Sequence, residues 1–390
     1  MEKIIKEIKL AYNDVKIVPA PISTIRHRSE CNPYVDKAKH LPIFTAPMTS
    51  IINAENFKYF DKFGIIPILP RISDFPLEQR IEYSLSGKWS AYSLDEFAKT
   101  WCNQEFANNN SEANNICALI DMANGHMSTV YPIVLSCKKI YGNRISVMIG
   151  NIASPESYEY AAKAGADYVR IGIGGGEGCL TSPISGVNYP MASLIVDTVK
   201  AREKVKLSNP YIKLPKIIAD GGIRNFEDIP KAIALGADYV MIGGQFSRIL
   251  ESAGPCKIFY CTYETTHPST ISTEIDGLTA LKEGRITFDG EHFNFLSVEG
   301  QCNLIAIQKH FYGMASTNGQ QDMAIKDKKG LEGLTKTVQI KYTLPYWVDT
   351  VTHGLRTAMS YCNAKTLEEF QANAQLIQIS ENAYKCLNAL

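Results

Sequence analysis

The 390-residue sequence lacks an excess of charge of either sign, because 40 Lys and Arg residues balance 40 Asp and Glu residues. It has no basic block of the kind that binds nucleic acid or an anionic membrane surface. No apolar run approaches the roughly 20 residues that a membrane-spanning helix needs. Residues 1–10 also lack the apolar core of a signal peptide. These absences predict a cytoplasmic protein that binds neither nucleic acid nor membranes.

Paired cysteine motifs are missing as well. The chain has ten cysteines but no CxxC pair, and no second pair of Cys or His follows Cys256 and Cys261 at zinc spacing. In a long chain without a signal peptide, such cysteines are more often reduced thiols than disulfides. Apolar residues make up 45% of the sequence, which is enough for a large core and argues against global disorder.

Short β-rich apolar runs alternate with helical segments through much of the chain. Segments such as 155–164 and 227–235 have apolar residues at helical spacing. Residues 161–172 and 232–243 form an internal repeat, in which each segment has the order helix, Gly, Ala-Asp, strand and Gly. This pattern predicts an α/β fold, a (β/α)8 TIM barrel, over an open doubly wound sheet. The predicted strands are 43–47, 65–69, 88–92, 116–121, 145–151, 167–171, 215–220 and 238–243.

Two regions fall outside the predicted barrel. Residues 256–310 are rich in Thr, Tyr and Phe with Asp-Gly turn signals, which predicts a β-hairpin excursion. Residues 317–347 contain Asn-Gly and a run of lysines, which predicts a mobile flap. Helices are expected near 349–361 and 366–375. We therefore predict a single catalytic domain over residues 1–390.

A glycine-rich loop with one cysteine follows the sixth predicted strand. Five glycines lie between residues 172 and 178, directly before Cys179 and Thr181. Glycines let the backbone approach a ligand closely, and the C-terminal ends of barrel strands carry the active site. The alternative is a flexible loop with a passive thiol. The position favours Cys179 as a nucleophile.

Glycines also follow the seventh and eighth predicted strands. Gly222 comes after Asp220 in one loop, and Gly243 and Gly244 form the other. Loops after these two strands are the usual phosphate site of a barrel. The alternative is that the glycines only make tight turns. A carboxylate at Asp220 can accept hydrogen bonds from ribose hydroxyls.

These motifs together resemble the IMP dehydrogenase/GMP reductase family. The resemblance rests on the Cys-x-Thr loop, IADGGIR at 218–224, ALGADYVMIGG at 234–244 and YGMAS at 312–316. It implies that Cys179 adds to purine C2, that Thr181 assists there, and that a nicotinamide exchanges hydride with C2. It also implies substrate contacts for Asp220, Gly222, Gly243, Gly244, Met314 and Ala315. It places Asp121, Asn124 and Gly125 on the nicotinamide side.

The resemblance further implies a homotetramer and a possible K+ held by backbone carbonyls of Gly174, Gly176 and Cys179. The dehydrogenase uses an Arg on its flap to activate water, but residues 317–347 contain no Arg. Only residues 70–87 fill the gap where the dehydrogenase commonly carries a regulatory domain pair. These features favour the reductase, which converts GMP to IMP with NADPH. The alternatives are IMP oxidation to XMP with NAD, another purine nucleotide as substrate, or a non-catalytic binding protein.

The chain departs from the family pattern around the ligand. Glu177 stands where the family has Ser in the phosphate-contacting part of the loop. Thr317 replaces the Glu that follows the YGM motif in the reductase, and Asp322 is the nearest acid downstream. An anionic Glu beside a phosphate is repulsive at low dielectric. Three alternatives follow: a cation or Arg intervenes beside Glu177, Glu177 points away, or the substrate is not a simple 5′-monophosphate.

Overall fold

Eight parallel strands form a closed barrel in the computed structural model, which describes residues 7–72, 75–261, 270–297, 300–323 and 333–387. A parallel bridge between Phe44 and Ile66 closes the ring, with the Thr45 N–H donating to the Ile66 carbonyl over 3.0 Å. The predicted TIM barrel is confirmed, and the open-sheet alternative is wrong. In hydrogen-bonded order the strands are β2 (Ile43–Thr45), β9 (Tyr239–Ile242), β8 (Lys216–Asp220), β7 (Tyr168–Ile171), β6 (Ile145–Ile152), β5 (Ile116–Asp121), β4 (Trp89–Tyr92) and β3 (Ile68–Leu69).

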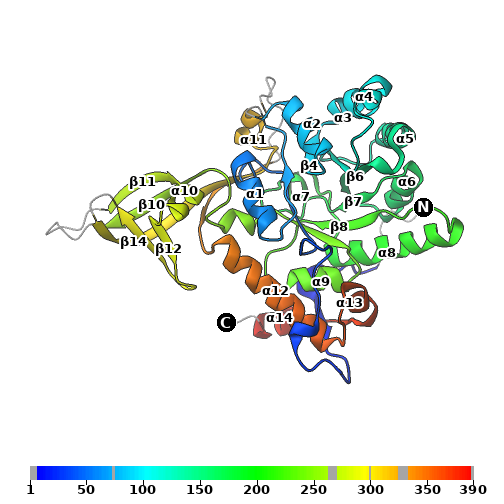
Figure 1. Ribbon diagram of the computed structural model, residues 1–390. Coiled ribbons are helices and arrows are strands. Elements are labelled where there is room, and N and C mark those ends of the chain that lie inside the picture. The colour runs from blue at the N-terminus through cyan, green and yellow to red at the C-terminus, as the bar shows by residue number, and fades with distance from the viewer. Residues whose placement is uncertain (1–6, 73–74, 262–269, 298–299, 324–332, 388–390) are drawn as a thin grey trace.

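Helices surround the barrel (Figure 1). Their ends follow local capping signals: the Ser93 hydroxyl accepts from the Glu96 N–H at the start of one helix, and Gly165 ends another with a φ of 83°. None of the described helices combines the length and hydropathy of a membrane span. The helices between barrel strands are α1 (Ala54–Lys62), α2 (Leu77–Leu85), α3 (Leu94–Trp101), α4 (Gln104–Asn109), α5 (Val130–Tyr141), α6 (Pro155–Ala164), α7 (Thr181–Ser185), α8 (Met191–Ser208) and α9 (Asp228–Ala234).

Side chains fill the barrel interior in layers. Phe44, Trp89 and Tyr168 pack edge to face, with ring centroids 5.8 Å apart for Phe44 and Trp89 and 5.2 Å apart for Trp89 and Tyr168. Because side chains alternate along a strand, the residue two positions after Tyr168 faces the same side. That residue is Arg170, which lies closer to the C-terminal mouth of the barrel. The interior therefore changes from apolar to charged toward the end that carries the site.

The excursion after β9 is a complete antiparallel sheet that projects to one side of the barrel (Figure 1). It is larger than the predicted hairpin, because strands far apart in the sequence pair within it. The Asp289-Gly290 turn joins two of its strands as predicted, whereas Asp276 caps a helix. The elements are β10 (Pro255–Cys261), β11 (Thr270–Asp276), α10 (Gly277–Lys282), β12 (Ile286–Phe288), β13 (Phe293–Ser297), β14 (Gly300–Tyr312) and β15 (Thr335–Gln339).

The predicted flap contains more regular structure than expected. Asn318-Gly319 lies inside helix α11 (Thr317–Asp322), β15 joins the antiparallel sheet, and residues 344–347 already belong to α12 (Leu344–Tyr361). The lysine run at 326–329 lies outside the described residues. The remaining elements are η1 (Tyr12–Asp14), β1 (Val15–Val18), η2 (Arg28–Glu30), η3 (Gly142–Arg144), η4 (Phe246–Arg248), α13 (Leu367–Asn373), β16 (Gln375–Gln378) and α14 (Glu381–Leu387). The nine cysteines with described side chains are all unpaired.

Candidate active site

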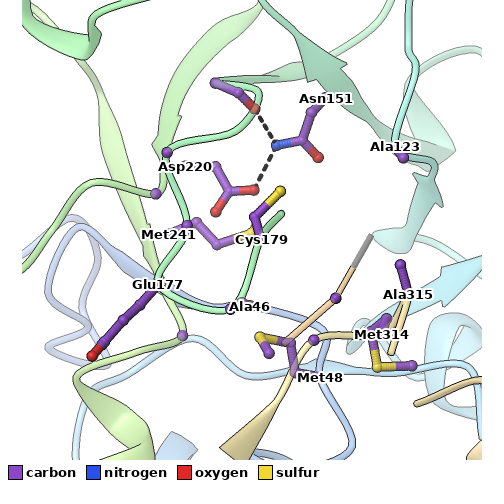
Figure 2. Close-up of a pocket in the computed structure, with 18 of the residues that line it drawn as sticks. Ala46, Met48, Ala123, Asn151, Glu177, Cys179, Asp220, Met241, Met314 and Ala315 are labelled. Carbon is purple, nitrogen blue, oxygen red and sulfur yellow. Dashed lines mark hydrogen bonds between the residues drawn. The ribbon is translucent and has the colours of Figure 1, made fainter. Parts of the chain in front are cut away.

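A cavity of about 540 Å³ opens at the C-terminal ends of the barrel strands. The glycine-rich loop after β7 forms much of its wall, and the segment after β14 lines it as well. Figure 2 shows Cys179 between Asp220 on one side and Met314 and Ala315 on the other. The predicted residues that line this cavity are Asp121, Gly174, Gly176, Cys179, Thr181, Asp220, Gly222, Gly243, Gly244, Met314 and Ala315.

Asn124 and Gly125 are not among the lining residues. The Gly125 N–H donates to the Asn151 carbonyl over 2.8 Å, and a Cβ at position 125 would lie 2.8 Å from that oxygen. The Asn124 side chain accepts from the His126 N–H over 3.1 Å. Both residues therefore shape the loop backbone, and Met122 and Ala123 line the cavity in their place.

The Cys179 thiol is half-buried and lies 3.3 Å from the Thr181 hydroxyl oxygen. The loop backbone positions it: the Cys179 N–H donates to the Gly176 carbonyl over 3.0 Å, and the Gly178 carbonyl accepts from the Leu334 N–H over 3.0 Å. The second bond ties the loop to the start of β15. Together these contacts present the thiol and its neighbouring hydroxyl to the same cavity.

A buried guanidinium joins the acids at the mouth of the barrel. Arg170, only 5% exposed, lies 2.7 Å from Asp121 at the end of β5 and 2.9 Å from Asp220 at the end of β8. Burial opposes its charge, but the two carboxylates outweigh that effect and raise the pKa of Arg170. The Asn151 amide donates to Asp220 over 2.7 Å and to the Gly172 carbonyl over 2.8 Å, as Figure 2 shows. This network fixes the Asp220 carboxylate.

Arg170 was not among the predicted site residues. The alternation of side chains along a strand could have identified it. Arg170 stands two positions after Tyr168, so it faces the same side of a predicted buried strand. A buried charge requires a partner, so an Arg at such a position predicts an acid at the ends of nearby strands. Asp121 and Asp220 were both predicted to contact ligands, but their ion pairs with Arg170 were not predicted.

Glu177 does not point into solvent. Its carboxylate pairs with Arg248 Nη2 over 2.7 Å and with Lys336, and its side chain is 24% exposed. Burial raises the pKa of this carboxyl, but the hydrogen bond from Lys336 and the charge of Arg248 outweigh that effect and hold the pKa below its usual value. The side chain extends away from Cys179 toward one end of the cavity (Figure 2). A cation or Arg beside Glu177 was one of the alternatives left open by the sequence, but Arg248 and Lys336 were not named.

Asp121 offers a carboxylate oxygen to a ligand in the cavity. Within the described part of the chain, only the longer 3.7 Å contact with Arg71 engages Asp121 Oδ2, which leaves an acceptor for a ligand N–H. The described residues contain no group of three or more His, Cys, Asp or Glu that could hold a metal ion. The Gly176 carbonyl accepts from the Cys179 N–H in a tight turn. A K+ at the loop carbonyls therefore stays a prediction.

The chain has relatives of two kinds. A sequence model described as the IMP dehydrogenase / GMP reductase domain matches residues 104–266 and 297–387. The inosine-5'-monophosphate dehydrogenase of Chlorobaculum parvum is 32% identical over 262 residues, which cover 67% of this chain and 44% of that protein. The GMP reductase of Klebsiella pneumoniae is 24% identical over 405 aligned residues that cover 100% of both chains. The GMP reductase of Caenorhabditis elegans is 24% identical over 98% of this chain and 95% of that protein.

The match spans less than half the length of the dehydrogenase. The domain match covers more than half of this chain and includes the cysteine loop and the glycines after β8 and β9. These are the parts that build the cavity around Cys179 and Asp220. The chain belongs to the IMP dehydrogenase/GMP reductase family.

Proposed function

We propose that this protein catalyses the GMP reductase reaction, the NADPH-dependent reductive deamination of a guanine to a hypoxanthine, with GMP as the reference substrate. The observation that carries the proposal is the Cys179 thiol beside the Thr181 hydroxyl, at 3.3 Å, in the cavity at the barrel mouth. A thiol that faces such a cavity can act as a covalent nucleophile. Support also comes from the GMP reductases, which this chain matches over nearly their whole length.

The reaction balances through one covalent adduct. The Cys179 thiolate sulfur bonds to purine C2. The C2 amino group then takes a proton from water at Thr181 and leaves as ammonia. NADPH, when bound, supplies the hydride that replaces the amino group at C2. The C–S bond then breaks and returns the thiolate, so the net change is guanine to hypoxanthine with one cofactor oxidised.

The other residues bind and orient the substrate. Asn151 and Arg170 both engage Asp220 Oδ2, so the described residues leave Asp220 Oδ1 to accept from ribose hydroxyls. Met314 and Ala315 lie along the purine, and Asp121 accepts from the carboxamide of the cofactor. Among the described residues, the acids that line the cavity are all paired with Arg or Lys. Water at Thr181 is therefore the proton source that we propose for ammonia release.

Asp322 does not take the part of the missing acid. Its carboxylate accepts from the Thr49 hydroxyl over 2.5 Å and from the Tyr312 hydroxyl over 2.7 Å. It is not among the residues that line the cavity. Burial raises the pKa of Tyr312 to about 12, which suits a structural phenol better than an acid for this step.

IMP oxidation to XMP with NAD is the second candidate. It is favoured by the higher identity to IMP dehydrogenases, at 32% for the Chlorobaculum parvum protein. Against it, residues 317–347 contain no Arg that could activate water. The test is absorbance at 340 nm: loss with GMP and NADPH supports reduction, whereas a gain with IMP and NAD+ would replace it with oxidation. If neither reacts, mass spectrometry of Cys179 adducts with a nucleotide panel separates another purine substrate from a non-catalytic protein.

We also propose that the chain acts as one catalytic domain in a homotetramer, as its resemblance to the family implies. Analytical ultracentrifugation of the full chain tests this directly. A sedimentation mass near four chains of 43.3 kDa is the expected result. A stable monomer at micromolar concentration would contradict it.

A further inference from the structure

The corner of the cavity beyond β8 and β9 is where a barrel of this kind takes a phosphate. Loops after the seventh and eighth barrel strands present backbone amides to an anion in many such folds. In this chain those loops contain Gly222, Gly243 and Gly244, all of which line the cavity. An empty corner with unpaired amides and cations would be ready for a phosphate monoester.

The corner is filled by a side chain of the protein itself. A Cβ built on Gly244 would lie 2.2 Å from Glu177 Oε2 and 2.9 Å from Glu177 Cβ, so the Glu177 side chain lies directly on the Gly244 backbone. The carboxylate is held there from two other elements, η4 through Arg248 and β15 through Lys336. A negative group already stands against the phosphate loop.

Three donors that a phosphate could use are also engaged. The Gly222 N–H donates to the Gly175 carbonyl over 3.0 Å. Arg248 Nη2 and Lys336 Nζ both donate to Glu177 Oε1. The neighbouring wall is the Phe311 ring, which lies 3.1 Å from a Cβ built on Gly178 and offers no polar hydrogen. A phosphate entering here would lose these bonds and meet a carboxylate.

We propose that Glu177 takes the place of the substrate phosphate, so that the substrate is a purine nucleoside with a free 5′-hydroxyl. This inference rests on the proposed function, since it names the substrate class of that same site. Among the residues that the structure describes, only a 3.4 Å contact from Arg248 Nη1 engages Glu177 Oε2, which leaves this oxygen to accept from a hydroxyl donor. A phosphate dianion has no such proton to donate and is repelled by the carboxylate.

The experiment compares guanosine with GMP as ligands and as substrates of the full-length protein with NADPH. Binding is measured by calorimetry and turnover by absorbance at 340 nm. For the unaltered protein we expect guanosine to bind about a hundredfold more tightly than GMP. This ratio is what repulsion between the GMP phosphate and the Glu177 carboxylate should cause. Glu177→Ser opens the corner and frees Arg248 and Lys336, so GMP should gain at least about tenfold in affinity while guanosine loses affinity.

Glu177→Gln keeps the shape of the side chain and removes its charge. Its preference for guanosine over GMP should fall between those of the unaltered protein and Glu177→Ser. This variant also replaces Glu177→Ser in the test if that variant does not fold. Glu159→Gln is the matched control, because Glu159 pairs with Lys204 on the surface. Tighter binding and turnover of GMP by the unaltered protein would overturn this inference and leave the proposed function standing. Preferred binding of guanosine without turnover of either ligand would support Glu177 in the place of the phosphate and would rule out the reductase reaction. Binding of neither would remove both.

Discussion

Arg170 Nη2 lies 2.9 Å from Asp220 Oδ2, and Nη1 of the same guanidinium lies 2.7 Å from Asp121 Oδ1. One buried cation from β7 thus links carboxylates from β5 and β8 across the mouth of the barrel. The link couples the cofactor side of the cavity, which we assign to Asp121, to the ribose side, which we assign to Asp220. We expect stability and ligand orientation to depend on it.

Replacing Arg170 by Met should destabilise the fold. The change leaves two buried carboxylates without their cation, and breaking a buried ion pair in this way costs about 3–5 kcal/mol. Urea denaturation followed by circular dichroism measures the loss. Lys204→Met is the control, since Lys204 pairs with Glu159 on the exposed surface and should have little effect. Equal stabilities for the two variants would show that the Arg170 network contributes nothing.

Replacing Cys179 by Ala should abolish turnover, with a loss of about a thousandfold or more in kcat if the covalent step is required. Thr181→Val keeps the shape beside the thiol and should cost about a hundredfold, the usual contribution of proton transfer. Cofactor oxidation at 340 nm gives the rates. Cys386→Ala is the control because Cys386 is exposed in α14, far along the chain from the loop. Normal rates in Cys179→Ala would exclude the covalent mechanism.

Glu251 should make stability depend on pH. Its carboxyl accepts from the Leu344 N–H over 2.8 Å at the start of α12, and burial raises its pKa from 4.5 to about 7. The folded protein therefore holds this proton more tightly than the unfolded chain does. The resulting stabilisation is complete below about pH 4.5 and is lost as the pH rises to about 7, a change of about 3 kcal/mol.

Glu251→Gln isolates this contribution, because Gln keeps an acceptor for Leu344 and does not titrate. The buried Lys309, whose pKa is lowered by burial, is present in both proteins, and its charge interaction with Glu251 is part of what the comparison measures. The unfolding free energy of the unaltered protein should fall relative to that of the variant between pH 4.5 and 7. Parallel curves for the two proteins in this window would contradict the assignment.

Two glycines offer a matched pair of alanine substitutions. Gly244→Ala places a methyl group 2.2 Å from Glu177 Oε2, so the Glu177 side chain must move away from its present contacts, and kcat/KM for guanosine should fall by about tenfold or more. Gly354→Ala lies in α12 with nothing within 4 Å of the added carbon, and should stabilise the protein by about 0.5–1 kcal/mol without changing activity. Activity assays and thermal denaturation of both variants test the pair. An active Gly244→Ala would mean that Glu177 moves freely.

The barrel could be predicted because its signals are local. Seven of the eight strands lie within a predicted segment and β6 runs one residue past its segment, while α6 and α9 occupy the segments with helical spacing. The antiparallel sheet could not be predicted in the same way. Its strand β14 pairs with β10, β13 and β15, and such pairing between distant segments is not encoded in the pattern of any one of them. Helix α11 replaced the turn expected at Asn318-Gly319 because the Ser316 hydroxyl caps it.

The sequence by itself identified the thiol that we propose as the nucleophile, the hydroxyl beside it and the strand end that carries them, because these features are contiguous in the chain. Tertiary structure alone decided which charges meet. Glu177 is paired with Arg248, 71 residues away, and with Lys336, 159 residues away. Arg170 finds its acids 49 and 50 residues away on other strands. The energy of a buried charge depends on the partners that the fold brings to it. The roles of Glu177 and Arg170 could therefore be assigned only from the tertiary structure.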